Sequence, residues 1–292
     1  MTTPTHQELY RHIRESLLTL NASPAQAEAE ALWILQDQLG ITPEALYRDG
    51  SQRLTESETA QLNDLLYQRT VKRIPLQYLL HEASFFGLKF YVNPHVLIPR
   101  PETELLVEQA LLCLKPGMRV LDVGTGPGTI ALSLAHQLSN AVTITAVDCS
   151  PEALLVAKIN QKKLGVTVRL MPAGDLFAPI GHESFDLIVS NPPYIDPQLK
   201  PSLSPEVLNH EPHTALFPPH EDAYYFYQRL AAEGKNHLTS HGKIIMECGA
   251  GMSPSIGQIL MIHGYKNIEI IRDYAGLDRV IMASLSAEAA PA

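Results

Sequence analysis

The sequence has few cysteines and no cysteine pair. Its three cysteines, Cys113, Cys149 and Cys248, are odd in number, lie far apart and form no CxxC motif. This pattern excludes a disulfide framework and a zinc knuckle, and it is typical of a reducing compartment. The residues between Met1 and Leu9 do not resemble a secretory leader, and no apolar run reaches about 18 residues. We therefore expect a cytoplasmic protein with no membrane contact.

Positive charge is also scarce. Lys and Arg number 22 against 31 Asp and Glu, which gives a net charge of −9. A protein that grips nucleic acid through its phosphates needs an excess of positive charge, so we expect no direct nucleic-acid partner. The chain has 292 residues, of which 45% are hydrophobic and 18% are charged. This length and composition predict a sizeable core and two domains, or one large domain with an extension.

Helix signals without strand signals fill the first 75 or so residues. Ser23 and Thr55 stand where N-cap residues belong, each followed three positions later by a capping-box partner, Gln26 or Glu58. Thr42-Pro43 opens a further short helix. Apolar residues at helical spacing are Leu9, Ile13, Leu17, Leu32, Trp33, Leu35, Leu62, Leu65 and Leu66. We expect a small all-helical domain over residues 1–75.

Strand signals begin after this region. Apolar residues alternate on both sides of Gly87 and predict a β-hairpin within a linker over residues 76–100. Beyond Pro101, helical patterns separate most of the apolar strand-like runs, which are 119–123, 143–148, 166–171, 186–190, 243–248, 267–272 and 279–284. The fold class is therefore α/β, with a doubly wound, mostly parallel sheet over residues 101–286 and a frayed tail over 287–292. The last two runs are too close for a crossover helix, so the final strand should be antiparallel.

A Gly-Thr-Gly-Pro-Gly turn at 124–128 joins the first strand of this sheet to a helix. Glycines let the backbone bend sharply and approach a ligand. Asp148 ends the next strand, 20 residues beyond Gly128. A carboxylate at this place suits the two hydroxyls of a ribose. These residues predict a nucleoside site that fits either NAD or S-adenosylmethionine.

The tetrapeptide Asn191-Pro192-Pro193-Tyr194 follows the fourth strand at the same edge of the sheet. The two prolines lack N–H groups and have a fixed φ, which makes the turn stiff. Such a turn can aim the side-chain oxygen of Asn191 and the carbonyl of Pro192 at one point, with Tyr194 as a flat wall. Two acceptors suit a planar –NH2 group whose nitrogen receives a methyl group. Hydride transfer needs no such site, so the turn favours S-adenosylmethionine over NAD.

At these residues the chain resembles the S-adenosylmethionine-dependent methyltransferases that act on amino groups. More narrowly, it resembles the HemK family, the peptide chain release factor glutamine methyltransferases. The stretches that carry this resemblance are 73–78 (Arg-Ile-Pro-Leu-Gln-Tyr), 97–104 (Leu-Ile-Pro-Arg-Pro-Glu-Thr-Glu), 124–128, 174–177 (Gly-Asp-Leu-Phe), 191–195, Glu211-Pro212 with Ala215-Leu216, and 278–280. Family members commonly have glycine where this chain has His81.

The resemblance implies a helical domain that docks the release factor, a hairpin linker and a Rossmann-like catalytic domain with seven strands. It implies methyl transfer from S-adenosylmethionine, which leaves S-adenosylhomocysteine, to the glutamine of the Gly-Gly-Gln motif in peptide chain release factors, without a metal. It places the target glutamine on residues 191–194, with Asn191, Pro192 and Tyr194 as catalytic residues and Pro193 beside them. The residues that it places around the cofactor are Arg100, Thr103, Gly124, Thr125, Gly126, Pro127, Gly128, Asp148, Leu176 and Asn191.

Within this set, the glycine turn would hold the amino-acid portion of the cofactor, Asp148 the ribose and Leu176 the adenine. Arg100 and Thr103 would close the pocket from the linker side. Three other functions stay open at this point. They are methylation of a glutamine in a ribosomal protein, methylation of an adenine or guanine amino group in nucleic acid, and nucleotide binding without catalysis. The net charge of −9 argues against the nucleic-acid substrate.

Overall fold

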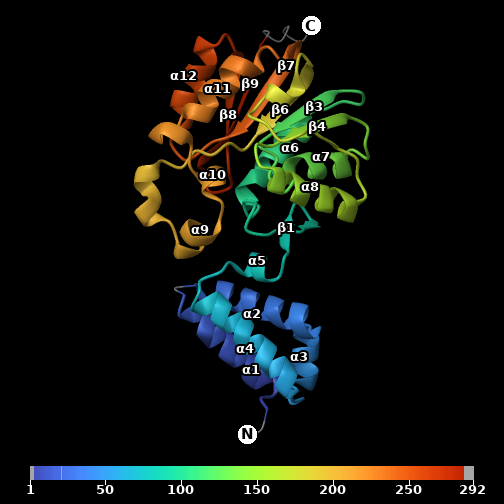
Figure 1. Cartoon of the computed structure of the whole chain (residues 1–292), viewed down its shortest axis with the longest axis vertical. Helices are drawn as coiled ribbons and strands as arrows, with labels where there is room; N and C mark the ends of the chain where they lie inside the picture. The colour runs from blue at the N-terminus through green and yellow to red at the C-terminus, as the bar shows by residue number, and fades with distance from the viewer. Residues whose placement is uncertain (1–2, 21, 286–292) are drawn as a thin grey trace. The chain divides into compact units, whose positions relative to one another are not determined.

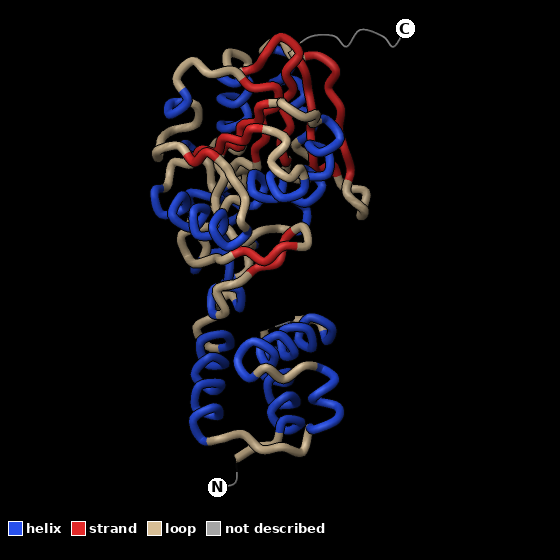
Figure 2. Tube along the Cα trace, turned by 90° about the vertical axis from the view of Figure 1, so that its right-hand side faces the viewer, coloured by secondary structure: helices blue, strands red, loops and turns tan. Residues whose placement is uncertain are grey.

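The computed structural model describes residues 3–20 and 22–285, so the tail expected over 287–292 lies outside the described residues. The chain divides into two compact units. One comprises residues 1–81 and 204–210, and the other comprises residues 82–203 and 211–292. Figures 1 and 2 trace the helices and strands of each unit.

The first unit is helical, as expected. Its helices are α1 (His6–Leu18), α2 (Pro24–Leu39), α3 (Pro43–Asp49), α4 (Glu56–Thr70), α5 (Leu76–Leu79) and α9 (Pro205–His210). The side chains of Ser23 and Thr55 accept the predicted capping bonds at the starts of α2 and α4. In α2 the core face consists of Ala27, Ala31, Ile34 and Leu35. Leu32 and Trp33 are therefore only partly buried, although the sequence pattern pointed to them.

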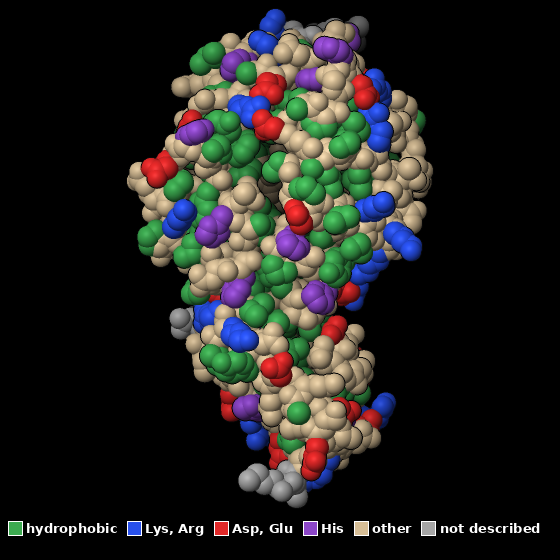
Figure 3. All heavy atoms as spheres, in the orientation of Figure 1, with side chains coloured by type: hydrophobic (Ala, Val, Ile, Leu, Met, Phe, Trp, Pro, Cys, Tyr) green, Lys and Arg blue, Asp and Glu red, His purple; other side chains and the backbone are tan. Residues whose placement is uncertain are grey.

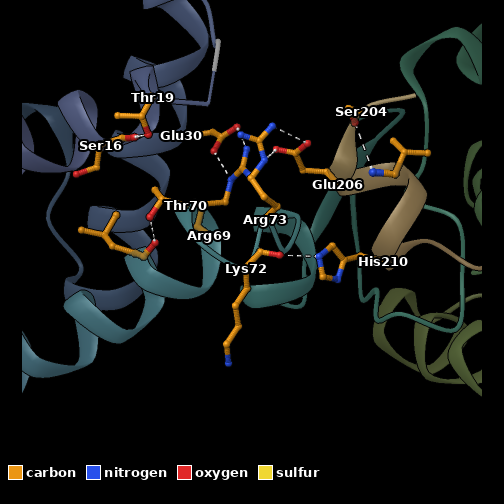
Figure 4. Close-up of polar contacts among 12 residues, drawn as sticks. Ser16, Thr19, Glu30, Arg69, Thr70, Lys72, Arg73, Ser204, Glu206 and His210 are labelled. Atoms are coloured by element: carbon orange, nitrogen blue, oxygen red, sulfur yellow. Dashed lines mark hydrogen bonds and ion pairs between the residues drawn. The ribbon is translucent and has the colours of Figure 1, made fainter. Parts of the chain in front are cut away.

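Helix α9 lies in sequence between the two segments of the second unit and yet packs with the helical unit (Figure 4). Glu206 accepts ion-pair contacts from Arg69 at 3.2 Å and from Arg73 at 3.0 Å. Arg69 also pairs with Glu30 at 2.9 Å, and its side chain is only 9% exposed. His210 donates to a backbone carbonyl of the same unit. The helical unit therefore reaches His81 and includes 204–210, beyond the expected range of 1–75.

The expected linker begins with a helix, because residues 76–79 form α5. The predicted hairpin follows as β1 (Ala83–Phe85) and β2 (Leu88–Phe90), which pair antiparallel. His81 has a φ of 52°, in the left-handed region that favours glycine. Glycine, which the resemblance leads us to expect at this position, would adopt this φ without strain.

The second unit contains the predicted seven-stranded sheet. Its strands are β3 (Arg119–Val123), β4 (Thr143–Val147), β5 (Arg169–Leu170), β6 (Phe185–Ser190), β7 (Leu238–Glu247), β8 (Lys266–Arg272) and β9 (Asp278–Ser284). Their order is β5-β4-β3-β6-β7-β9-β8, and β9 runs antiparallel to both of its neighbours, as predicted. Strand β5 is shorter than the run at 166–171, and β7 begins earlier than residue 243.

Helices cover both faces of this sheet. The helices of this unit are α6 (Glu104–Cys113), α7 (Thr129–Gln137), α8 (Pro151–Leu164), α10 (His213–Leu216), α11 (Tyr225–Gly234) and α12 (Ser253–Ile262), and its 3-10 turns are η1 (Pro101–Thr103), η2 (Ala178–Ile180), η3 (Pro197–Ser202) and η4 (Pro219–Glu221). Figure 1 shows α7 and α8 on one side of the sheet and α11 and α12 on the other. Alternate strand residues such as Val120 and Leu121 enter separate cores with the helices of each side. Within the described chain, every helix is too short or too polar to span a bilayer.

The strand order reverses direction between β3 and β6. After β3 the chain adds β4 and β5 on one side, and then it returns to place β6 on the other side. The last residues of β3 and β6, Val123 and Ser190, are partners in the parallel ladder. The hydroxyl of Ser190 donates to the carbonyl of Val123 at 2.7 Å. The two turns predicted from sequence therefore begin side by side, at the kind of switch point where α/β sheets bind ligands.

Candidate active site

A cavity opens at this switch point, within the second unit. The predicted site residues that line it are Arg100, Thr103, Gly124, Thr125, Gly126, Pro127, Asp148, Leu176, Asn191, Pro192 and Pro193. Gly128 and Tyr194 are not among the lining residues. The wall also contains the linker residues His95, Val96, Leu97 and Pro99, and Phe226 at the start of α11. Sequence reasoning assigned a site role to none of them, although Leu97 and Pro99 lie in the stretch 97–104 that carries the resemblance.

The glycine turn has the backbone shape that the sequence predicted. Gly126 has a φ of 56°, and a Cβ added there would meet nothing within 4 Å. The turn therefore leaves open space above its backbone, where a ligand could approach. Gly128 has a different reason for being glycine, because a Cβ there would lie 2.7 Å from Leu132. It begins α7 with a φ of 87° and allows the turn to pack closely on that helix.

Asp148 follows β4 and faces this turn. One carboxylate oxygen accepts the N–H of Gly126 at 2.8 Å, and the other accepts the N–H of Ser150 at 2.9 Å. Burial raises the pKa of Asp148, while these backbone bonds oppose the rise. Hydrogen bonds from the backbone and side chain of Cys149 also act on this carboxylate. The carboxylate is thus fixed in place, and it remains an acceptor that faces the cavity.

Asn191 and Pro192 bring two acceptors to the cavity wall. The side-chain nitrogen of Asn191 donates to the hydroxyl oxygen of Thr103 at 3.1 Å. Among the described residues, no group donates to the side-chain oxygen of Asn191 or to the carbonyl of Pro192. This arrangement leaves both oxygens for a ligand.

Tyr194 takes a different place from the flat wall that we expected. Its ring packs against Gly249, where an added Cβ would lie 3.0 Å from the ring. Its hydroxyl donates to a carboxylate oxygen of Glu247 at 3.3 Å. Burial raises the pKa of Tyr194, so the hydroxyl keeps its hydrogen and can act as a donor.

Three polar side chains that sequence reasoning did not assign hold the site together. Glu211 accepts from Arg100 at 2.6 Å and from the N–H of Ile98 at 3.1 Å. The amide of Asn160 donates to the carbonyls of Tyr91 and Pro127, both at 2.9 Å, and accepts the N–H of Tyr91. These two side chains attach the linker to the cavity wall and to the glycine turn.

Glu247 is the third of these side chains. It ends β7 and is 1% exposed, and its carboxylate accepts the hydroxyl of Thr103 at 2.5 Å. Burial raises the pKa of Glu247 to about 7. An acidic residue directly after the apolar run Ile244-Ile245-Met246 was a signal that could have found it, because strand ends at this edge carry the site.

Comparison with known proteins bears on what this site does. The model of a family described as "Methyltransferase domain" matches residues 114–247, and that of "PrmC N-terminal domain" matches residues 8–80. A release factor glutamine methyltransferase from Geobacter sulfurreducens is 38% identical over 255 residues, which are 87% of this chain and 88% of that protein. The chain belongs to the release factor glutamine methyltransferase family.

Other members of this family match nearly the whole chain. The release factor glutamine methyltransferase of Bacteroides thetaiotaomicron is 35% identical over 94% of this chain and 98% of that protein. A crystal structure of a methyltransferase from Pyrococcus furiosus is 20% identical, has a TM-score of 0.54 and covers 78% of this chain and 100% of that chain. This structural likeness concerns the fold, and it agrees with the predicted α/β class.

Proposed function

We propose that this glutamine methyltransferase family member transfers a methyl group from S-adenosylmethionine to the glutamine side-chain nitrogen in the Gly-Gly-Gln motif of peptide chain release factors. The observation that carries the proposal is the pair of free acceptors, the side-chain oxygen of Asn191 and the carbonyl of Pro192, in one cavity with Asp148 and the glycine turn. The relatives' names support the choice of release factors as substrate.

The cavity fits the cofactor in the chemistry of its donor set. Asp148 would accept the ribose hydroxyls, and the open backbone at Gly126 leaves room for the amino-acid portion. Leu176 would contact the adenine, while Arg100 and Thr103 would close the pocket. When bound, S-adenosylmethionine supplies a methyl group on a positively charged sulfur.

The chain's own contribution is to hold the glutamine amide. An amide nitrogen is a weak nucleophile because its lone pair is delocalised into the carbonyl group. If Asn191 and Pro192 each accept one N–H of the target –NH2 group, they draw electron density onto the nitrogen and fix its orientation. The methylated amide is acidic and can lose its extra proton to water, so these acceptors need no strong base beside them.

The surface charge supports a protein substrate over nucleic acid. Figure 3 shows basic side chains interspersed with acidic, histidine and uncharged ones on one face. With a net charge of −9, the protein has little excess positive charge to attract the phosphates of a nucleic acid. Action on release factors would place the protein in the cytoplasm, where translation ends.

The test is methyl transfer from labelled S-adenosylmethionine to purified release factor, ribosomes and DNA. We expect label on release factor alone, at one glutamine by mass spectrometry, and none when that glutamine is changed to glutamate. Asn191→Ala should abolish turnover and cost less in cofactor affinity, because its main task is to hold the amide in the transition state. Label on another residue, on ribosomes or on DNA would contradict the proposal.

A further inference from the structure

Glu247 is a buried carboxylate without an ion-pair partner among the described residues. Each of its oxygens accepts a hydroxyl instead, one from Thr103 at 2.5 Å and one from Tyr194 at 3.3 Å. A buried charge that lacks a cation destabilises a protein. Its place beneath two residues of the predicted site suggests that the carboxylate serves the site rather than the stability of the fold.

The hydrogens in this network can be assigned one by one. A threonine hydroxyl has one hydrogen, and that of Thr103 is donated to Glu247. Its oxygen can then only accept from Asn191, whose side-chain nitrogen lies 3.1 Å away. The amide of Asn191 is therefore held with its nitrogen toward Thr103 and its oxygen free.

Without the carboxylate of Glu247, the side-chain amide of Asn191 would lose its fixed orientation. A Thr103 hydroxyl that is not bound to Glu247 can turn its hydrogen toward Asn191, and an amide that rotates by half a turn would accept it. Asn191 would then present its own –NH2 group to the –NH2 group of the substrate. Two donors that face each other cannot form a hydrogen bond.

We propose that Glu247, acting through Thr103, is a positioning residue that keeps the side-chain oxygen of Asn191 turned toward the substrate amide. This inference rests on the proposed function. Thr103 then has a second task besides lining the cavity. Neither Glu247 nor Thr103 takes a proton from the substrate in this scheme.

The ionised form of Glu247 is the one that orients the network, since a protonated carboxyl can itself donate to Thr103. Burial raises the pKa of Glu247 to about 7. The titratable or charged groups that interact electrostatically with Glu247 are Glu102, Tyr194, Tyr227, Cys248 and Arg279. Arg279 favours the charged carboxylate, and Glu102 opposes it. We expect kcat to rise with pH through a midpoint near 7.

The test compares Glu247→Gln, Thr103→Val and Thr103→Ser in the full-length chain, with saturating S-adenosylmethionine and release factor as substrate. Glu247→Gln and Thr103→Val should each lower kcat by about tenfold or more, with a smaller change in cofactor Kd. Thr103→Val removes the hydroxyl, and Glu247→Gln replaces a carboxylate that can only accept with an amide whose nitrogen can donate to Thr103, so neither variant fixes the direction of the hydrogen bonds. Thr103→Ser keeps the hydroxyl and should restore most of what Thr103→Val loses. The kcat of Glu247→Gln should also show no rise with a midpoint near pH 7.

A matched control is Ser133→Ala on α7, which removes a buried hydroxyl that has no partner among the described residues. It should leave kcat within about twofold of the unmodified chain. A Glu247→Gln variant that keeps kcat or the pH midpoint overturns the inference, and so does a Thr103→Ser variant that is as slow as Thr103→Val. An unmodified chain that labels no release factor contradicts the proposed function instead.

Discussion

Asp148 is the residue on which cofactor affinity should depend most. Asp148→Ala removes a carboxylate that can accept two hydroxyls and that also holds the N–H of Gly126. Hydrogen bonds to a charged group contribute about 1.5 to 3 kcal/mol each, so we expect the Kd for S-adenosylmethionine to rise tenfold or more. Isothermal calorimetry measures this change.

Glu183→Ala is the matched control for Asp148→Ala. It removes one negative charge near the start of β6, at the opposite edge of the sheet, where Glu183 pairs with Arg119 and Arg169. Its cofactor Kd should stay near that of the unmodified chain. Equal affinities in both variants would show that Asp148 does not hold the ribose.

Asp122 should make the stability of the protein depend on pH. Burial raises the pKa of this residue from 3.8 to about 7, and one of its oxygens has no hydrogen-bond partner among the described residues. Between these values the native carboxyl keeps its proton, whereas the unfolded chain has lost it. The free energy of unfolding should therefore fall as pH rises from about 4 to about 7.

The variant Asp122→Asn isolates this effect, because an amide does not ionise and its oxygen can still accept from both Thr125 and Ala131, which donate to the same oxygen of Asp122. Urea unfolding measures the free energy of unfolding at pH 5 and at pH 8. Between these two pH values, this free energy should fall more for the unmodified chain than for the variant. The same loss in both proteins would mean that Asp122 titrates at its ordinary pKa.

Among the elements, α8 joins the hairpin to the glycine turn through one side chain. Asn160→Leu keeps the branched shape of Asn160 but removes the amide that bonds to three backbone groups of Tyr91 and Pro127. We expect the free energy of unfolding to fall by about 2 kcal/mol or more, measured by denaturant titration. Lys158→Leu, on the exposed side of the same helix, should change it by less than about 0.5 kcal/mol.

Local sequence signals predicted these elements far better than they predicted the contacts between them. The apolar runs of β3 and β6 and the turns at 124–128 and 191–194 depend on neighbouring residues, so the sheet and both turns could be predicted. The partners of Asn160, Glu211 and Glu247 lie 33 to 144 residues away. Local sequence signals do not reveal such distant pairings, so the contacts of these three side chains were missed, although Glu211 lies in a stretch that carries the family resemblance.

At the scale of the whole molecule, the helical unit should serve recognition and leave chemistry to the sheet. Every residue that lines the cavity lies in the other unit. Deletion of residues 1–81 should therefore keep S-adenosylmethionine affinity within about twofold while raising KM for the release factor about tenfold or more. Steady-state kinetics and calorimetry on the two chains measure these values.

A short Gly-Gly-Gln peptide provides the control for this deletion. Such a peptide is too small to use a separate docking domain, so both chains should methylate it with similar kcat/KM. If the deletion leaves KM for intact release factor unchanged, the helical unit has no part in docking. Retained cofactor affinity shows that the shortened chain still folds.

The placement of α9 also affects how chimeras between related proteins can be built. The helical unit is not one continuous piece of chain, because Glu206 pairs with Arg69 and Arg73 from a position 137 residues beyond the first of them. A chimera joined at residue 81 would take residues 204–210 from the other protein, and it would keep these ion pairs only if that segment also has an acidic residue at the place of Glu206. Carrying both segments over together preserves the ion pairs whatever the other sequence is.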